Sequence, residues 1–454
     1  MSADDLRARS ARAVWHPYTE VGALERSAFP VIERAQGCSL FDVDGRELLD
    51  GISSWWCANL GHGHPRIVAA IREQASRLQH VLLGGASHPR AIELAERLAA
   101  VAPRGLGHAM FGADGSMAVE AALKIALQYW VHRGQPGRHR FVALEGGYHG
   151  DSLGAIGVGF VEGFHAPFRK AVRPALRVPA PRCTRCPVAE HPVSCDVECL
   201  APMEALLQRH HRECAAVVVE PLLQAAAGMR IHGDESLRRI RELCDRYGLL
   251  LVADEIATGF GRTGAMFACD RAGVVPDILT VGKGLTGGSL PLSATLVTDE
   301  IYGAFRPAGG QARTFFHGTT FCGNPIAAAA ALAALEAYRE ERVVEGIPAR
   351  AAILAEGMTR VARRLGVPPP RQLGLVAAVE IPDADGGAGR ARAVVARALE
   401  LGLFLRPLGP VVYLWPPLNA PEAVLRDMLE RLEQAAADGA PGGAGATRAT
   451  RSRA

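Results

Sequence analysis

Short, uninterrupted apolar runs that alternate with helical stretches constrain the fold of this chain more than any other feature. The runs 141–144, 216–219 and 249–252 have the length and unbroken apolar character of strands buried on both faces. Helical periodicity is present at 235–247, between the last two runs, and recurs earlier at 67–80, 89–101 and 115–131. Because strands alternating with helices form βαβ units, the pattern predicts an α/β domain with a largely parallel sheet.

The two ends of the chain predict a second, smaller domain. The segment "GCSLFDVDGRELLDG" has the pattern of a hairpin turned at Asp44 and Gly45. After residue 341 the pattern changes to helices around "LGLVAAVEI" and "GLFLRPLGPVVYLWPP", which is typical of an α+β domain. The predicted divisions are 1–60 and 341–437 for the small domain, 61–340 for the large domain, and a disordered tail at 438–454.

Composition argues against several classes of function. The formal net charge of +3 is too small to indicate a nucleic-acid partner. The first residues lack the apolar segment of a secretory signal, and the alanine-rich run 326–335 is too short to cross a bilayer, so no membrane association is expected. The ten cysteines mostly stand singly in apolar segments, which indicates reduced thiols in a cytoplasmic protein.

One lysine, Lys283, stands between a strand-like run and a glycine-rich turn in "ILTVGKGLTGG". A buried lysine loses hydration, so its pKa falls and its amine becomes a nucleophile. By itself the stretch favours a plainer interpretation, a lysine at the edge of a sheet whose amine reaches water.

Two further motifs suggest groups that hold a charged ligand. Gly115 and Ser116 open a long helix, and the free backbone N–H groups of a helix start bind phosphate. Most such starts, however, are ordinary helix caps. Asp254 ends a buried strand, at the edge where α/β sheets bind ligands. A buried aspartate needs a cationic partner, which a protonated pyridine nitrogen supplies; the alternative is an aspartate that caps the next turn.

Two more motifs complete the set. Tyr148 lies in a glycine-rich turn after a strand, where its ring can stack on a flat ligand or simply form the rim of a loop. Gly318, Thr319 and Thr320 offer hydroxyl and backbone donors to an anion ahead of the next helix. A phosphate cradle, a carboxylate, a stacking ring and a nucleophilic amine are together what pyridoxal 5'-phosphate needs. We therefore expect Lys283 to bind this cofactor as an internal aldimine.

The spacing of Asp254-Glu255, Asp277 and Lys283 resembles the class-III aminotransferases of fold type I, from about residue 15 to about residue 417. More narrowly, "WHPYT", "DGISSWWCANLGHGHP", "HVLLGG", "DEIATGFGRTG" and "LRPLGPVVYLWPP" resemble the adenosylmethionine-8-amino-7-oxononanoate aminotransferases of biotin synthesis. The resemblance implies a mostly parallel seven-stranded sheet between helices in the large domain, beside a smaller α+β domain. It also implies ping-pong transamination in a homodimer with active sites at the subunit interface.

The resemblance assigns roles to individual residues. It implies that Lys283 binds the cofactor, that Asp254 pairs with its ring nitrogen and that Tyr148 stacks on the ring. Gly115 and Ser116 would hold the phosphate, with Thr319 and Thr320 reaching it from the neighbouring subunit. Tyr18, Trp55 and Gly318 would line the substrate pocket, where Tyr148 and Lys283 also face the substrate, and Arg406 would bind the carboxylate of the oxononanoate. A guanidinium in an apolar stretch suits such a clamp, although the plainer interpretation of Arg406 is a surface ion pair.

Other functions remain open from the residues. An ω-aminotransferase acting on 4-aminobutyrate or a diamine, or an aminomutase of the glutamate-semialdehyde type, would use the same lysine and aspartate. A regulator that binds the cofactor without turnover is disfavoured because every part of the site is present. The amino donor is S-adenosyl-L-methionine by resemblance, with lysine as the alternative.

A cysteine-rich insertion at 181–200 contains Cys183, Cys186, Cys195 and Cys199. The spacing, C-x-x-C followed by C-x-x-x-C, is similar to that of zinc ligands. Because the loop is short, reduced cysteines in a surface loop are favoured over structural zinc, and a redox-sensitive pair is a third interpretation. We expect no metal in catalysis.

Overall fold

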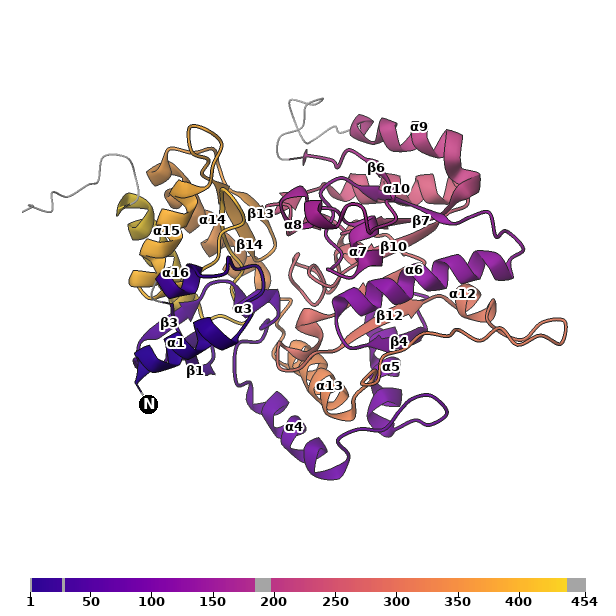
Figure 1. Ribbon diagram of the computed structural model, residues 1–454, viewed down its shortest axis with the longest axis horizontal. Helices are drawn as coiled ribbons and strands as arrows, with labels where there is room; N and C mark the ends of the chain where they lie inside the picture. Colours follow the sequence, from indigo (N-terminus) through magenta and orange to yellow (C-terminus); the bar gives the residue numbers. More distant parts are fainter. Residues whose placement is uncertain (1, 27–28, 184–196, 439–454) are drawn as a thin grey trace, which may run out of the picture.

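The computed structural model describes residues 2–26, 29–183 and 197–438, and its centre is a mixed seven-stranded sheet (Figure 1). In spatial order the strands are β4 (His108–Gly112), β12 (Ser293–Val297), β11 (Ile278–Val281), β10 (Leu250–Asp254), β7 (Cys214–Val219), β5 (Arg140–Leu144) and β6 (Leu176–Val178). The five strands from β11 to β6 are parallel to one another, whereas β12 is antiparallel to both of its neighbours. The predicted sheet, mostly parallel and seven-stranded, is confirmed.

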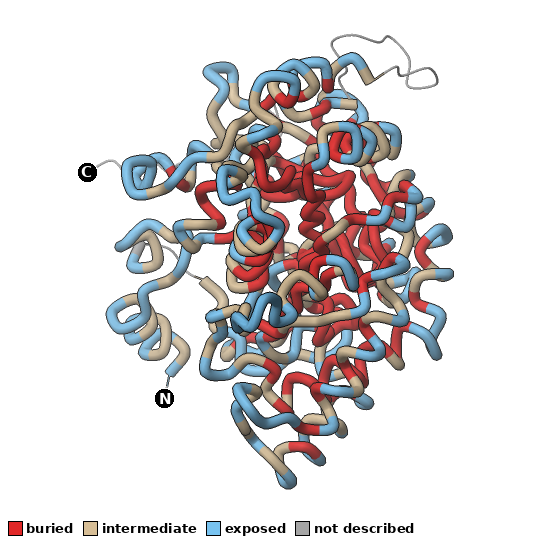
Figure 2. The backbone as a smooth tube through the Cα atoms, turned by 90° about the vertical axis from the view of Figure 1, so that its right-hand side faces the viewer, coloured by how far each residue is buried: buried red, intermediate tan, exposed pale blue. Residues whose placement is uncertain are grey.

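The central strands are apolar along their whole length because both faces of the sheet are covered. Val217 and Val219 of β7 pack into one hydrophobic cluster, while Ala216 and Val218 pack into another on the opposite face. This alternation follows from the period of two along a strand. In Figure 2 the buried residues accordingly concentrate in the interior, and exposed residues line the outer helices.

Helices cover the two faces of the sheet. On one face lie α6 (Gly115–His132) and α7 (Leu153–Val158), whose side chains belong to the second cluster. The other cluster includes α5 (Pro89–Val101), α9 (Ala201–His210), α10 (Asp234–Tyr247) and α13 (Pro325–Glu340). The remaining helices of this part are α4 (Pro65–Arg77), α8 (Glu162–His165), α11 (Ala268–Ala272) and α12 (Asp299–Gly303).

The two ends of the chain come together in a four-stranded sheet. Its order is β1 (Ile32–Gln36), β2 (Ser39–Asp42), β3 (Glu47–Asp50) and β15 (Leu403–Phe404), so a C-terminal strand pairs with an N-terminal one. Strands β2 and β3 form the predicted hairpin, where Gly45 adopts a φ of +80°. Beside them lie a sheet of β13 (Arg371–Leu373), β14 (Val376–Glu380) and β16 (Val411–Leu414), and helices α14 (Ile347–Leu365), α15 (Gly389–Glu400) and α16 (Glu422–Asp438). This is the smaller α+β part; its exact boundaries stay predictions.

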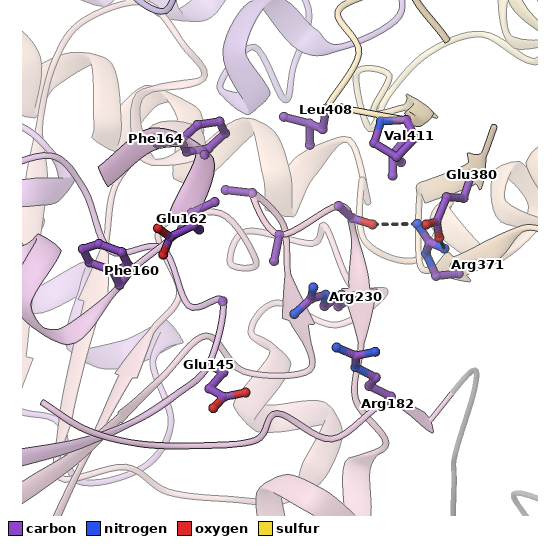
Figure 3. A pocket seen from close by; sticks show the side chains of 18 of the residues that line it. Glu145, Phe160, Glu162, Phe164, Arg182, Arg230, Arg371, Glu380, Leu408 and Val411 are labelled. Atoms are coloured by element: carbon purple, nitrogen blue, oxygen red, sulfur yellow. Dashed lines mark hydrogen bonds and ion pairs between the residues drawn. The ribbon is translucent and has the colours of Figure 1, made fainter. Parts of the chain in front are cut away.

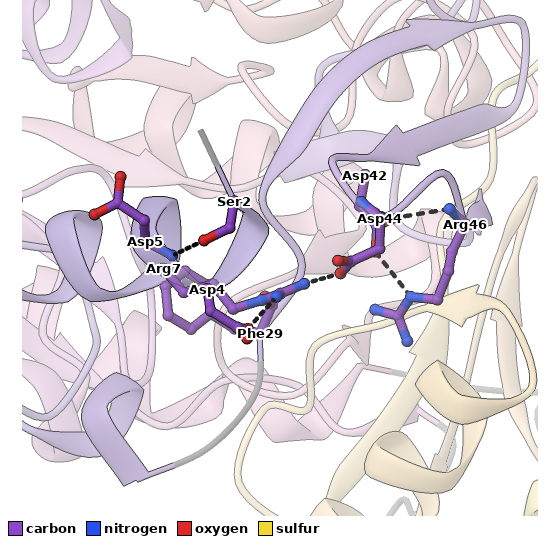
Figure 4. A network of polar contacts seen from close by, with 8 residues as sticks. All are labelled: Ser2, Asp4, Asp5, Arg7, Phe29, Asp42, Asp44 and Arg46. Carbon is purple, nitrogen blue, oxygen red and sulfur yellow. Dashed lines mark hydrogen bonds and ion pairs between the residues drawn. The ribbon is translucent and has the colours of Figure 1, made fainter.

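The N-terminal helix α1 (Ala3–Ala13) differs from the strand-and-turn character that the sequence predicts before residue 56. None of its residues is buried, so no apolar periodicity marks it. It begins with Ser2 as N-cap, which accepts a hydrogen bond from the N–H of Asp5. Arg7 joins it to the body of the protein by an ion pair with Asp44 in the β2–β3 turn and by a 3.1 Å hydrogen bond to the carbonyl of Phe29 (Figure 4).

Some predictions fall outside the described residues. These are the cysteine-rich segment at 184–196, including Cys186 and Cys195, and the tail after Asp438. Within residues 2–26, 29–183 and 197–438, no helix combines the length and apolar character needed to span a bilayer.

Candidate active site

Four parallel neighbours in the large sheet end at one edge, and each delivers polar side chains there. Strand β5 leads to Tyr148 and His149, β7 to Glu220, and β11 to Lys283, while β10 ends with Asp254 itself. The carboxyl edge of parallel strands is where open α/β sheets bind ligands. The structure therefore places Lys283, Asp254 and Tyr148, which the sequence predicts as site residues, at the same edge of the sheet.

Asp254 is buried and held in one orientation. One carboxylate oxygen lies 2.7 Å from Nδ1 of His149, and the other accepts hydrogen bonds from Thr280 Oγ1 at 3.2 Å and the N–H of Ile256 at 3.1 Å. Burial alone would lower the pKa of His149, but the hydrogen bond and charge of Asp254, with the charge of Glu220, outweigh it and raise that pKa. The histidine thus supports a negative charge that could face a cationic ring nitrogen.

Glu220 is a second buried carboxyl at the same edge. Its oxygens accept hydrogen bonds from the backbone N–H groups of Tyr148 at 3.0 Å and Ala225 at 3.2 Å. Burial raises its pKa to about 7, against the opposing effect of nearby His149. Glu220 therefore fixes the loop that carries Tyr148 and titrates near neutrality.

Lys283 begins a short 3₁₀ turn, Lys283–Thr286, directly after β11. Burial lowers the pKa of its amine, although the charges of Asp254 and Glu220 oppose the shift. The amine lies 5.4 Å from the centre of the Trp56 ring and donates no hydrogen bond to the described part of the chain. A desolvated amine without an acceptor is the form in which lysine acts as a nucleophile or base.

The start of α6 lies next to the Tyr148 loop. Asp114, the N-cap, accepts a 3.0 Å hydrogen bond from the N–H of Met117, which leaves the N–H groups of Gly115 and Ser116 without an intrahelical acceptor. Ser116 Oγ accepts a 3.2 Å hydrogen bond from the N–H of Asp151. The N–H groups that the sequence predicts as a phosphate cradle thus lie beside the loop that holds Tyr148.

A cluster of aromatic rings with one guanidinium lies next to the same loop. The hydroxyl of Tyr18 lies 3.3 Å from that of Tyr148 and donates to Asp151 at 2.7 Å. Tyr18 and Trp55 meet edge to face at 5.7 Å between ring centres, and the Arg406 guanidinium lies 4.6 Å from the centre of the Trp55 ring. Tyr18, Trp55, Tyr148 and Arg406, which are far apart in sequence, are therefore brought together.

Several residues of this region adopt left-handed backbone conformations that side chains rarely occupy. The φ angle is +53° at Tyr18, +64° at Trp56 and +42° at Lys283. Such conformations cost roughly 1–3 kcal/mol each and persist where the surroundings enforce them. Near Trp56 the enforcing group is Asp50, which accepts hydrogen bonds from the N–H groups of Ile52 and Ser54.

Gly318, Thr319 and Thr320 are not brought to Lys283 within the described chain. Their segment precedes α13 and runs beside α6, where His317 lies 3.2 Å from the Lys124 amine. Gly318 and Thr320 are exposed, whereas the Thr319 hydroxyl is buried without a hydrogen-bond partner in the described residues. Gly318 and Thr320, which are exposed, are therefore the members of this segment that a group outside the described chain can reach.

The cysteine prediction is tested only at its ends. Cys183 accepts a hydrogen bond from the N–H of Gly233 with its Sγ at 2.9 Å, and Cys199 is half-buried. Groups of three or more metal-ligating side chains are absent from the described residues. Cys186 and Cys195 lie outside them, so a metal at this insertion stays a hypothesis.

Comparison with known proteins identifies the family. The sequence profile of the aminotransferase class-III family matches residues 22–436. The chain belongs to the class-III aminotransferases. It is 40% identical to an adenosylmethionine-8-amino-7-oxononanoate aminotransferase of Geobacter sulfurreducens (94% of this chain, 96% of that one) and 42% identical to one of Nitratidesulfovibrio vulgaris (95% and 81%).

Solved structures agree with this membership. A crystal structure of an adenosylmethionine-8-amino-7-oxononanoate aminotransferase from Methanocaldococcus jannaschii is similar with a TM-score of 0.90 at 34% identity, covering 97% of this chain and 100% of that one. A PLP-bound amine transaminase from an uncultivated Pseudomonas species gives a TM-score of 0.87 at 34% identity, covering 94% and 98%. The fold type I assignment and the aminotransferase class are therefore confirmed.

Pyridoxal 5'-phosphate is the cofactor of such an enzyme, and the residues of this chain fit it. The desolvated amine of Lys283, the buried carboxylate of Asp254 and the free N–H groups at the start of α6 match its aldehyde, ring nitrogen and phosphate.

Proposed function

We propose that the protein transfers an amino group to 8-amino-7-oxononanoate, which yields 7,8-diaminononanoate for biotin synthesis, with S-adenosyl-L-methionine as donor. Relatives that carry this name at 40 and 42% identity over nearly the whole chain support the proposal. The main structural support for this substrate is the cluster of Tyr18, Trp55 and Arg406. An aliphatic chain that ends in a carboxylate needs apolar walls and one cation, and this cluster offers both.

The chain's residues divide the chemistry among them. Bound pyridoxal phosphate supplies an electron-poor ring that accepts the electron pair of a breaking C–H bond. Asp254 would keep the ring nitrogen protonated, and Tyr148 would stack on the ring. The Lys283 amine would act as the base that takes the proton from the carbon bearing the donor's amine and gives it back. Gly115 and Ser116 would bind the phosphate through their N–H groups.

Two half-reactions pass through the same site, so the kinetics are ping-pong. Donor and acceptor occupy the pocket in turn, and Trp55 covers the apolar chain of the acceptor. The Lys283 amine serves both halves as the base, which a lowered pKa makes possible near neutral pH.

Arg406 is proposed to bind the carboxylate of the acceptor. Its Nη2 donates to the carbonyl of Tyr18 at 3.0 Å, which orients the guanidinium over the pocket. Arg406→Ala should raise KM for the oxononanoate about 30- to 100-fold, because a charge-assisted hydrogen bond is lost, with little change for the donor. Arg406→Lys keeps the charge without the bidentate geometry, so its KM for the oxononanoate should lie between those of the wild type and Arg406→Ala. Separate steady-state titrations of the two substrates measure this, and equal losses for both would argue against a dedicated clamp.

The donor is tested by offering S-adenosyl-L-methionine and lysine separately with the oxononanoate and quantifying the diamine by mass spectrometry. The proposal predicts diamine with adenosylmethionine. If only lysine yields diamine, lysine is the amino donor in place of adenosylmethionine. Turnover of 4-aminobutyrate or glutamate semialdehyde without turnover of the oxononanoate would overturn the proposed substrate.

We also propose a cytoplasmic homodimer whose active sites lie between subunits. Large apolar side chains exposed on the single chain support an interface, among them Trp15, Phe316 and Phe321. The exposure of Gly318 and Thr320 supports a contribution from this segment to the partner's site. Free thiols at Cys38, Cys57 and Cys322 fit a reducing compartment.

A further inference from the structure

A cavity of about 730 Å³ lies beside the cluster of Tyr18, Trp55 and Arg406. Neither Lys283 nor Asp254 lines it. Its walls come from the loop after β5, from α8, from the connection of β8 (Leu223–Gln224) to β9 (Arg230–Ile231), and from the turn before β16. Figure 3 shows the arrangement of the lining side chains. The volume is in the range of small-molecule sites.

The two ends of the cavity differ in character. Phe164, Leu408 and Val411 lie together at one end, and Arg182 and Arg230 lie together at the other (Figure 3). The apolar end faces the substrate region, since Phe164 also packs edge to face against Tyr18 at 5.3 Å between ring centres. The cavity is therefore amphipathic, with a cationic end away from Tyr18.

The arginines at the cationic end differ in how they are paired. Arg371 is engaged by Glu380 at 3.0 Å and by the carbonyls of Gly228 and Met229. Glu162, on the opposite wall, pairs with Arg169 outside the lining. Arg182 and Arg230 make no ion pair with the described residues, and the carboxylates of Glu380 and Glu145 act on Arg230 only through their charge.

Arg230 is held in place without a carboxylate partner. Its side chain makes no hydrogen bond or ion pair with the described residues, yet it is half-buried. A Cβ at Gly146 would lie 2.8 Å from its Nη1, so only the bare backbone there, at a φ of +76°, admits the guanidinium. Burial, followed by repulsion from Arg182 and Arg371, lowers the pKa of Arg230. A bound anion would stabilise a half-buried arginine in this state, because it would pair with the partly desolvated charge.

We propose that this cavity is a second ligand site, which binds an aliphatic monocarboxylate with its head group on Arg230 and Arg182 and its chain against Phe164, Leu408 and Val411. A carboxylate can accept hydrogen bonds from both arginines, which make no ion pair with the described residues. The apolar end of the cavity would bury the aliphatic chain of such a ligand away from water. An inorganic anion has no chain and would leave this apolar surface without a partner. This site goes beyond the proposed transamination, whose carboxylate clamp is Arg406.

The test uses the full-length enzyme loaded with its cofactor and carrying Arg406→Gln, so that the transamination pocket loses its own clamp. Isothermal titration calorimetry with sodium octanoate should show saturable binding, and sodium acetate should bind at least about ten-fold more weakly because it lacks the chain. Adding Arg230→Gln should weaken octanoate binding about ten-fold or more. The matched control, Arg77→Gln on α4, removes an exposed arginine elsewhere and should leave the affinity unchanged.

A second variant tests the apolar end independently. Leu408→Ser should weaken octanoate but leave acetate unchanged. The proposal is overturned if Arg406→Gln alone abolishes octanoate binding, since the ligand then belongs to the transamination pocket. It is equally overturned if Arg230→Gln leaves the octanoate affinity intact, or if acetate binds as tightly as octanoate. None of these outcomes depends on which substrate the enzyme transaminates, so the proposed function is tested separately.

Discussion

Glu220 is the buried residue from which a pH dependence follows. Its carboxyl faces His149, Asp254 and Lys283, and its pKa in the folded protein is about 7. An unfolded glutamate has a pKa of about 4.3, so the folded state holds the proton more tightly. Stability contributed by the protonated form is therefore present below about pH 4 and is lost as the pH rises through about 7.

Glu220→Gln should remove this loss because the amide cannot ionise. Between pH 5 and pH 8 the wild-type protein should lose up to about 3 kcal/mol of unfolding free energy relative to the variant. Thermal unfolding followed by circular dichroism at the two pH values measures this: the melting temperature of the wild-type protein should fall more between pH 5 and pH 8 than that of the variant. Parallel changes in both proteins would mean that Glu220 does not titrate in this range. Asp383→Asn, at a half-buried carboxyl held by backbone donors, is the control.

At the level of single residues, the sequence predicted those site residues whose neighbours in the sequence are unusual. Lys283 stands out among glycines, and Asp254 ends an apolar run. His149 and Glu220 were missed, although Glu220 follows its buried strand as directly as Asp254 ends another. The contact of His149 with Asp254 joins positions 105 residues apart, which no local pattern reveals.

At the scale of elements, apolar runs predicted β5, β7, β10 and β11 because both faces of these strands are buried. Helix α5 was predicted at its full extent, since Pro89 marks its start and Leu94 and Leu98 repeat on its buried face. Helix α1 could not be predicted in the same way. It buries no residue, and what holds it is polar and distant in sequence.

Helix α1 should accordingly depend on Arg7. Arg7→Ala removes the ion pair with Asp44 and the hydrogen bond to Phe29, so amide hydrogen exchange across residues 3–13 should speed up. The melting temperature should change little, because a surface ion pair contributes only about 0–1 kcal/mol. Arg12→Ala, an exposed residue of the same helix, is the control. Unchanged exchange in Arg7→Ala would show that other contacts hold the helix.

For the whole molecule, the decisive feature is the proposed sharing of sites between subunits. The segment containing Thr319 and Thr320 does not contact Lys283 in its own chain, which a single sequence cannot reveal. If these threonines bind the neighbour's cofactor phosphate, Lys283→Ala and a Thr319→Val/Thr320→Val double variant should complement each other. After subunit exchange, a mixed dimer has one site with both intact parts.

Mixing the two proteins should therefore restore transamination above the sum of the separate proteins. The control mixes Lys283→Ala with Asp254→Ala/Thr319→Val/Thr320→Val, in which no mixed dimer contains an intact site. Absence of recovery, while mass spectrometry of the intact complexes shows that mixed dimers form, would contradict the shared site. A fully active monomer in analytical ultracentrifugation would do so as well.

The account depends most on the bond between Lys283 and the cofactor, which one measurement addresses directly. The purified protein is incubated with pyridoxal 5'-phosphate, treated with borohydride and digested, and the peptides are mapped by mass spectrometry. The account predicts a visible absorbance band before reduction and a single phosphopyridoxyl group, fixed on Lys283. A protein that stays colourless, or a label that falls on another lysine in both the native protein and Lys283→Ala, would contradict it.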